Sequence, residues 1–248
     1  MTIPILMLHY IESGNLKGVG DWSISNAKFS VLLDCIEEKR LKTITFAEFE
    51  ASAQTIDTKN SVIITFDDCP KNLFDFVVPE LIRRKMKAVF YVPTAYIDSY
   101  NAWDVNEQGF DKINLIDREQ IKFLAENNME VGSHGHFHLK QSKIAVSSQK
   151  DELVYSKEIL EGIIQKPIYS FAFPYGETPK QYQKLLKSFG YKYGVSIYKA
   201  NTNRYALRRI VIHKTDTKKS ILFKLSTSYS KLRYLLDSYL SLRKVLKR

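Results

Sequence analysis

The sequence has few cysteines and no long apolar run, and each shortage excludes a class of protein. Its 248 residues include only two cysteines, Cys35 and Cys69, which lie far apart in unlike contexts. Two such cysteines cannot form the disulfide framework of a small secreted domain, and they are compatible with a reducing compartment. No stretch approaches the roughly 18 to 20 uninterrupted apolar residues that cross a bilayer. The composition is that of a globular protein.

The first nine residues lack a basic segment and a small-residue cleavage site, which a secretory signal peptide needs. We interpret them as a first β-strand. This favours a cytoplasmic protein, with a peripheral position at the inner face of the membrane as a further expectation.

Positive charge is concentrated at the C-terminus. The net charge is +10, and residues 219–248 contribute +7 of it through eight Lys or Arg against one Asp. The remaining 218 residues carry 29 basic and 26 acidic side chains. A body this balanced has no basic face for nucleic acid, so we expect no nucleic-acid partner.

Residues 226–248 have apolar residues at helical spacing, with Lys and Arg on the intervening positions. This pattern predicts a basic amphipathic helix, which either packs on the folded body or lies on an anionic membrane surface. We therefore divide the chain into a domain over 1–218 and a tail over 219–248.

Predicted strands and helices alternate along the domain. Apolar runs typical of strands span 1–9, 41–46, 61–66, 88–92, 129–133, 168–173 and 193–197, and helical patterns span 25–36, 74–85, 117–124, 150–164 and 179–189. This order favours a parallel α/β sheet with crossover helices. The number of units and a length near 250 residues favour closure into a (β/α) barrel.

Two adjacent carboxylates, Asp67 and Asp68, follow the buried run 61–66. Successive strand side chains point in opposite directions, so we expect the two to face different ways and to serve different tasks. One would bind a metal and the other would handle a proton. The alternative is a strand end that leads into a helix N-cap, where Asp is common for backbone reasons.

Three of the five histidines, His134, His136 and His138, lie within five residues. Whether the segment is helical or extended, at least two imidazoles share one face. Histidine and carboxylate ligands with an open position are typical of a catalytic Zn²⁺ or a similar metal. The alternative is a polar loop whose histidines are solvated or hydrogen-bonded within turns.

Three motifs resemble, in order, those of the polysaccharide deacetylase family (NodB-like, carbohydrate esterase family 4). They are Thr65-Phe66-Asp67-Asp68, Gly132-Ser133-His134-x-x-x-His138 and Phe173-Pro174-Tyr175-Gly176. The resemblance covers roughly residues 3–215 and implies a distorted (β/α) barrel. The segment 5–10 also resembles the first strand of the subgroup that acts on N-acetylglucosamine polymers and related surface sugars.

The resemblance implies that Asp68, His134 and His138 bind one divalent metal ion. Zn²⁺ is the first expectation, and Co²⁺, Ni²⁺ and Mn²⁺ are compatible with the same ligands. Such a metal lowers the pKa of a bound water from about 15.7 toward 7. We place His136 beside the ligands rather than among them. We expect Cys69 to be extended, because it precedes proline, and not to be a fourth ligand.

The resemblance also implies the remaining roles. Asp67 would be the general base, and the backbone N–H of Tyr175 would stabilise the oxyanion, a contribution typically of about 2.7 to 4 kcal/mol. An ordinary turn explains Pro174-Tyr175-Gly176 equally well. Tyr175, Pro174 and His9 would contact the substrate, although a buried, hydrogen-bonded histidine is the alternative for His9.

Two departures from the family pattern concern an arginine and the general acid. Many members have an arginine, which orients the catalytic aspartate, where this chain has Ala172. The resemblance offers Arg209 as the replacement. The family's general acid is a late histidine, and the only late one here is His213. Its surroundings match poorly, and an exposed strand-end histidine is the alternative.

Together these features predict a metal-dependent hydrolase of carbon–nitrogen bonds other than peptide bonds. It would remove an N-linked acetyl or other acyl group from an amino sugar of a surface polysaccharide, or from a lipid-linked precursor. The alternative is a catalytically impaired barrel that keeps the metal site and binds carbohydrate. The sugar, the acyl group and the oligomeric state stay open.

Overall fold

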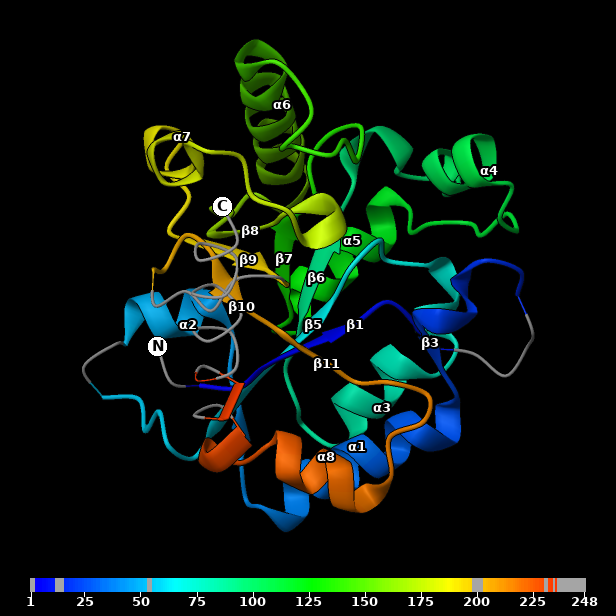
Figure 1. Ribbon diagram of the computed structural model, residues 1–248, viewed down its shortest axis with the longest axis vertical. Helices are drawn as coiled ribbons and strands as arrows, with labels where there is room; N and C mark the ends of the chain where they lie inside the picture. Colours follow the sequence, from blue (N-terminus) through cyan, green and yellow to red (C-terminus); the bar gives the residue numbers. More distant parts are fainter. Residues whose placement is uncertain are drawn as a thin grey trace, which may run out of the picture.

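Eight parallel strands form one nearly closed barrel in the computed structural model, which describes residues 3–11, 16–52, 55–197, 203–229, 232–233 and 235 (Figure 1). The predicted distorted (β/α) barrel is thus confirmed. In spatial order the strands are β11 (Ile210–Val211), β1 (Ile5–Leu8), β5 (Ser61–Phe66), β6 (Val89–Val92), β7 (Glu130–Ser133), β8 (Ser170–Ala172), β9 (Tyr193–Ser196) and β10 (Leu207–Arg208).

The barrel closes at one residue. Strand β10 pairs with β9 and strand β11 pairs with β1, and these are the two edges of the sheet. Only Arg209 separates β10 from β11 in the sequence, and its N–H donates to the carbonyl of Ser196 at 3.0 Å. One backbone segment therefore connects both edges. Outside this order, β4 (Lys42–Thr43) pairs with β5, and β2 (Tyr10–Ile11) pairs with β3 (Ser23–Ile24).

Helices surround the strands (Figure 1). The α-helices are α1 (Asn26–Glu38), α2 (Phe46–Ala51), α3 (Val77–Arg83), α4 (Ala102–Gln108), α5 (Arg118–Glu126), α6 (Val146–Ile164), α7 (Tyr182–Ser188) and α8 (Lys218–Lys224). Short 3₁₀ turns are η1 (Val19–Asp21), η2 (Lys71–Phe74), η3 (Thr94–Tyr96) and η4 (Pro174–Gly176). Ser25 caps α1 and Asp117 caps α5, each accepting a hydrogen bond from a backbone N–H in the first turn.

Two apolar clusters follow the alternation of the strands. On β5, Val62, Ile64 and Phe66 belong to the large cluster that includes residues of the surrounding helices, whereas Ile63 belongs to a smaller cluster inside the barrel. Because side chains alternate with period two, the inward face continues from Ile63 to Asp67. The strand thus delivers a carboxylate to the interior of the barrel at its carboxyl end.

The predicted strand over 41–46 is wrong beyond Thr43. Thr45 accepts a hydrogen bond from the backbone of Glu48, and the Glu48 side chain accepts one from Thr45, which makes a capping box that begins α2. The predicted helix over 74–85 is also shorter, because η2 occupies its start.

The structure describes the predicted tail only in part. Helix α8 lies beside α1, and Ile221 and Leu225 are buried (Figure 1). The amphipathic helix predicted over 226–248 falls mostly outside the described residues. Among those that are described, no helix is long and apolar enough to span a bilayer.

A buried carboxylate at the start of β7 gives a prediction about stability. Glu130 accepts hydrogen bonds from Ser170 Oγ (2.6 Å) and from the N–H of Ala47 (2.8 Å), yet burial raises its pKa from 4.5 to about 7. Between these pH values the folded state keeps a proton that the unfolded chain releases. The contribution of Glu130 to the free energy of unfolding is therefore fully present below pH 4.5, and it is lost as the pH rises through 7.

We expect Glu130→Gln to remove this dependence, because the amide oxygen can accept from the N–H of Ala47 and the amide NH₂ can donate to Ser170 Oγ without ionising. Relative to the variant, the wild type should lose up to about 3 kcal/mol of unfolding free energy between pH 4.5 and 7. Urea unfolding at a series of pH values measures the difference. Parallel curves for the two proteins would contradict the assignment.

Candidate active site

The two adjacent aspartates lie together, and the prediction that they face different ways is wrong. Strand β5 ends at Phe66, and Asp68 and Cys69 then adopt left-handed backbone angles with φ of 63° and 56°. This turn ends the strand alternation. Both carboxylates are buried, and Nε2 of His134 lies 3.9 Å from Asp67 Oδ2 and 3.4 Å from Asp68 Oδ1. The expectation that Cys69 is extended is wrong for the same reason.

Asp68, His134 and His138 converge on one point. Asp68 Oδ1 lies 3.4 Å from His134 Nε2 and 3.3 Å from His138 Nε2, and one ligand atom from each residue lies within 4.8 Å of the others. Around a tetrahedral metal with bonds of about 2.0 to 2.2 Å, ligand atoms lie about 3.3 to 3.6 Å apart. The spacing therefore fits a single metal ion.

The hydrogen bonds of these three residues also fit a metal. Asp68 Oδ1 is buried without a hydrogen-bond partner among the described residues, which is costly unless another group binds it. His134 Nδ1 lies 2.9 Å from the carbonyl of Ala172, so the ring donates there and directs the lone pair of Nε2 toward Asp68. The Cys69 thiol instead lies 3.2 Å from the carbonyl of Tyr91, away from this group.

Burial and neighbouring groups shift the pKa values of His134 and Asp68 in the direction that metal binding requires. Burial lowers the pKa of His134 to about 4, so its imidazole is neutral at pH 7. Burial alone would raise the pKa of Asp68, but the imidazoles of His138, His9 and His134 together bring it well below its ordinary value. A carboxylate and two imidazoles form a donor set suited to Zn²⁺ and similar ions.

Arg209 holds Asp67 by two hydrogen bonds. Its Nη1 and Nη2 donate to Oδ1 and Oδ2 of Asp67 at 2.5 and 2.6 Å, and both residues are 2% exposed. Nη1 also donates to Thr65 Oγ1 at 3.2 Å. Burial would raise the pKa of Asp67, but the charge of Arg209 and its hydrogen bonds outweigh burial and lower the pKa. Asp67 is therefore an ionised carboxylate held in one orientation.

His9 lies beside Asp67, with Nε2 3.7 Å from Asp67 Oδ2. Burial lowers its pKa, while the two aspartates act in the opposite direction. His213 is placed differently. Its N–H donates to Asp216 at 2.7 Å, its ring lies 3.0 Å from Thr215 Oγ1, and no ion pair or hydrogen bond within the described residues connects it to Asp67. Of these two histidines, His9 is thus the one that lies beside Asp67.

The turn η4 places Tyr175 over the metal ligands. Tyr175 has φ of 59° and ψ of 7°, and its ring centroid lies 5.0 Å from that of His138. Gly176 N–H donates to the carbonyl of Phe173, whereas the described residues offer the N–H of Tyr175 no acceptor. A backbone donor at this position is available to a substrate. Pro174 is buried behind the turn.

Glu152 on α6 supports the histidine loop, and the sequence analysis did not find it. Its carboxylate accepts hydrogen bonds from the N–H groups of His136, Phe137 and Leu139 at 3.1, 2.7 and 3.4 Å. A Cβ on Gly135 would lie 2.5 Å from Glu152 Oε2. The glycine between two histidines was the only sequence signal of this close approach. His136 Nδ1 binds Thr94 at 2.8 Å and is not one of the metal ligands.

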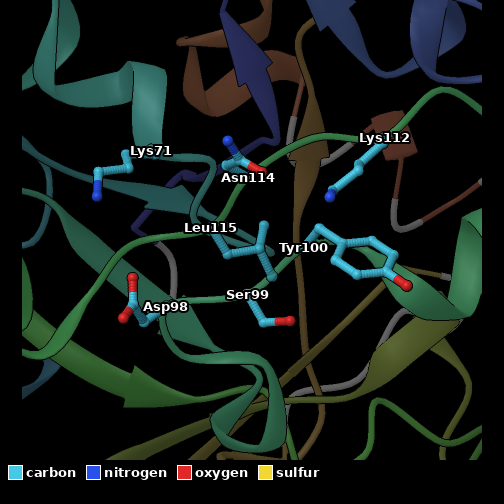
Figure 2. Close-up of a pocket in the computed structure, with 7 residues that line it drawn as sticks. All are labelled: Lys71, Asp98, Ser99, Tyr100, Lys112, Asn114 and Leu115. Carbon is cyan, nitrogen blue, oxygen red and sulfur yellow. The ribbon is translucent and has the colours of Figure 1, made fainter.

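An open pocket of about 300 Å³ lies apart from these ligands. It is formed where residues 98–100 and 112–115 pair as short antiparallel segments next to Lys71. Figure 2 shows Lys112 and Tyr100 on one side of it, and Lys71 and Asp98 on the other. Its lining includes none of the metal ligands, so the chemistry is assigned from the ligand geometry.

Comparison with known proteins agrees with this geometry. The polysaccharide deacetylase family model matches residues 54–194. Poly-β-1,6-N-acetyl-D-glucosamine N-deacetylase of Staphylococcus aureus (strain MRSA252) is 24% identical over 210 residues, which are 79% of this chain and 70% of that protein. The deacetylase PplD of Streptococcus pyogenes, solved with acetate, superposes with a TM-score of 0.74 at 21% identity, over 90% of this chain and 98% of PplD. IcaB of Ammonifex degensii superposes with 0.73 at 20% identity, over 90% and 96%.

The Arg209–Asp67 pair gives a prediction about pH dependence. Removing the guanidinium in Arg209→Ala leaves a buried, unpaired carboxylate, so we expect a loss of about 3 to 5 kcal/mol in unfolding free energy. The pKa of Asp67 should rise, and the acidic limb of the kcat/KM profile should move to higher pH, because a base must be ionised. Arg209→Lys should be intermediate, since it keeps the charge and loses the two-point contact.

Arg83→Ala is the matched control, because Arg83 forms an exposed ion pair with Glu80 on α3. It should cost less than about 1 kcal/mol and leave the pH profile unchanged. An acidic limb that stays in place in both Arg209 variants would show that the arginine does not set the ionisation of the base.

Proposed function

Because the chain belongs to the polysaccharide deacetylase family, we propose that it is a metal-dependent hydrolase that removes N-linked acetyl groups from an amino-sugar polymer. The observation that carries the proposal is the buried group of Asp68, His134 and His138 beside the ionised Asp67. The likeness to the S. aureus enzyme suggests N-acetylglucosamine units as the substrate. Lipid-linked precursors and other acyl groups stay within the proposal as further substrates to test.

Each residue near the ligands has a distinct role in this proposal. Asp68, His134 and His138 would hold the metal ion, Zn²⁺ first, which would supply Lewis-acid chemistry toward water and the acyl carbonyl. Asp67 accepts the proton of the attacking water, because Arg209 keeps its carboxylate ionised and oriented. The N–H of Tyr175 donates to the carbonyl oxygen as it gains negative charge.

We assign the general acid to His9 rather than to His213. Its Nε2 lies 3.7 Å from Asp67, so acid and base flank the same small space. His9 would give a proton to the nitrogen as the carbon–nitrogen bond breaks. His213 binds Asp216 and Thr215 instead.

A carbohydrate-binding barrel without hydrolysis was the alternative, and Ala172 was one reason for it. The contact between Arg209 and Asp67 weakens that reason, because a guanidinium from the segment between β10 and β11 holds the base. No residue of the described site favours the binding module over the hydrolase.

Acetate release tests the proposal. We expect the purified protein to release acetate from β-1,6-linked N-acetylglucosamine oligomers, to lose this activity after treatment with a chelator, and to regain it with Zn²⁺ or Co²⁺. Asp67→Asn should lower kcat by about 10²- to 10⁴-fold and still bind metal, because the three ligands are unchanged. Metal binding without acetate release from these oligomers or from lipid-linked N-acetyl sugars would favour the binding module.

Two single variants, His9→Gln and His213→Gln, distinguish the two candidates for the general acid. His9→Gln should lower kcat by about 10²- to 10⁴-fold, because proton transfer to the leaving nitrogen is lost, whereas His213→Gln should stay within a factor of about two. Metal content by elemental analysis controls for loss of the site. The reverse result would return the role to His213.

A further inference from the structure

The two tryptophans of the chain have opposite surroundings. Trp103 is 5% exposed and stacks on the metal-site residue His138, with ring centroids 4.2 Å apart. Trp22 is 42% exposed, and its ring centroid lies 5.2 Å from that of His9. An exposed indole therefore borders the histidine beside the base, and none of the roles assigned above uses it.

The backbone of Trp22 is fixed. Its N–H donates to the carbonyl of Val19 at 2.9 Å, and its carbonyl accepts from the N–H of Tyr10 at 3.4 Å. Val19 is 1% exposed and packs with Tyr10 and Ile113. Trp22 thus directly precedes β3, and β3 pairs with β2, the strand that directly follows His9.

Two other segments hold the same turn from outside. Lys17 and Asp111 exchange two hydrogen bonds, at 2.7 and 3.1 Å. Lys214 Nζ donates to the carbonyl of Gly20 and to Asp21 at 3.1 and 2.9 Å. Because these contacts already order the turn, a ligand that packs on the indole costs little further conformational entropy.

Exposure increases from the base outward. The side chain of Asp67 is 3% exposed, that of His9 is 15% exposed, and Trp22 is 42% exposed as a whole residue. The acyl group must reach the buried end, where the base and the metal ligands lie. The part of the substrate that contacts Trp22 is then the part that extends toward solvent.

We propose that Trp22 is a platform for the pyranose ring of the sugar unit next to the one that is deacylated. A pyranose ring presents C–H groups on its faces, and an indole offers a large flat apolar surface to cover them. The contact needs no charge, so it suits a neutral N-acetylhexosamine. This inference rests on the proposed function and makes the enzyme selective for oligomers over single sugars.

The test compares substrate lengths in Trp22→Ala and Trp22→Phe. For a β-1,6-linked N-acetylglucosamine tetramer, Trp22→Ala should raise KM and lower kcat/KM by about tenfold, with Trp22→Phe in between. For 4-nitrophenyl acetate, which has no neighbouring unit, the change should be much smaller. Phe123→Ala is the matched control, because Phe123 is also 42% exposed and lies on α5. It should leave both substrates unchanged.

A binding measurement separates this inference from the proposed function. In Asp67→Asn, the tetramer should shift the tryptophan emission, and adding Trp22→Phe should reduce the shift to the contribution of Trp103, which stacks on His138. Emission and binding that depend on Trp22, without acetate release from the wild type, would support the platform and reject the hydrolase. Equal losses on the tetramer and on 4-nitrophenyl acetate would overturn the platform, because Trp22 would then act only through His9.

Discussion

The buried pair of Arg209 and Asp67 is the interaction on which the site depends. Arg209 is the residue between β10 and β11, so the segment that closes the barrel also supplies the guanidinium that binds Asp67. A carboxylate that is 2% exposed would otherwise be protonated or excluded. Arg209 therefore both connects the two edges of the barrel and keeps Asp67 ionised.

A second constraint is the left-handed turn at Asp68 and Cys69. Positive φ at a residue other than glycine costs roughly 1 to 2 kcal/mol, and two such residues in succession need compensation. The turn is stabilised by the bond from Cys69 N–H to the carbonyl of Asp67 (2.7 Å) and by the bond from Ile116 N–H to the carbonyl of Cys69 (3.1 Å). The turn brings the carboxylates of Asp67 and Asp68 to the same imidazole of His134, which a continuing strand could not do.

Much of the barrel was predictable, because apolar runs and helical patterns alternate and several helices begin at recognisable caps such as Ser25 and Asp117. The two-residue strands β10 and β11 carry no periodicity, so their pairing across the seam was not readable. The metal-site residues came from a resemblance carried by short motifs. Glu152 was missed, because nothing in the sequence of a helix shows that one of its glutamates accepts hydrogen bonds from three N–H groups of the preceding loop.

The choice between His9 and His213 shows what strand register adds to sequence. In β1, Leu8 pairs with Phe66, and its carbonyl accepts from the N–H of Asp67, so His9 follows directly alongside Asp67. In β11, Val211 pairs with Met7, so the same register places His213 at the level of His9. Both histidines thus end neighbouring strands at the same edge of the barrel. The chain after Val211 turns back through Asp216, which binds the His213 N–H, whereas β1 leads into β2 and leaves His9 beside Asp67. The sequence shows only that a histidine follows each strand. The path of the chain beyond each strand determines which histidine lies beside Asp67.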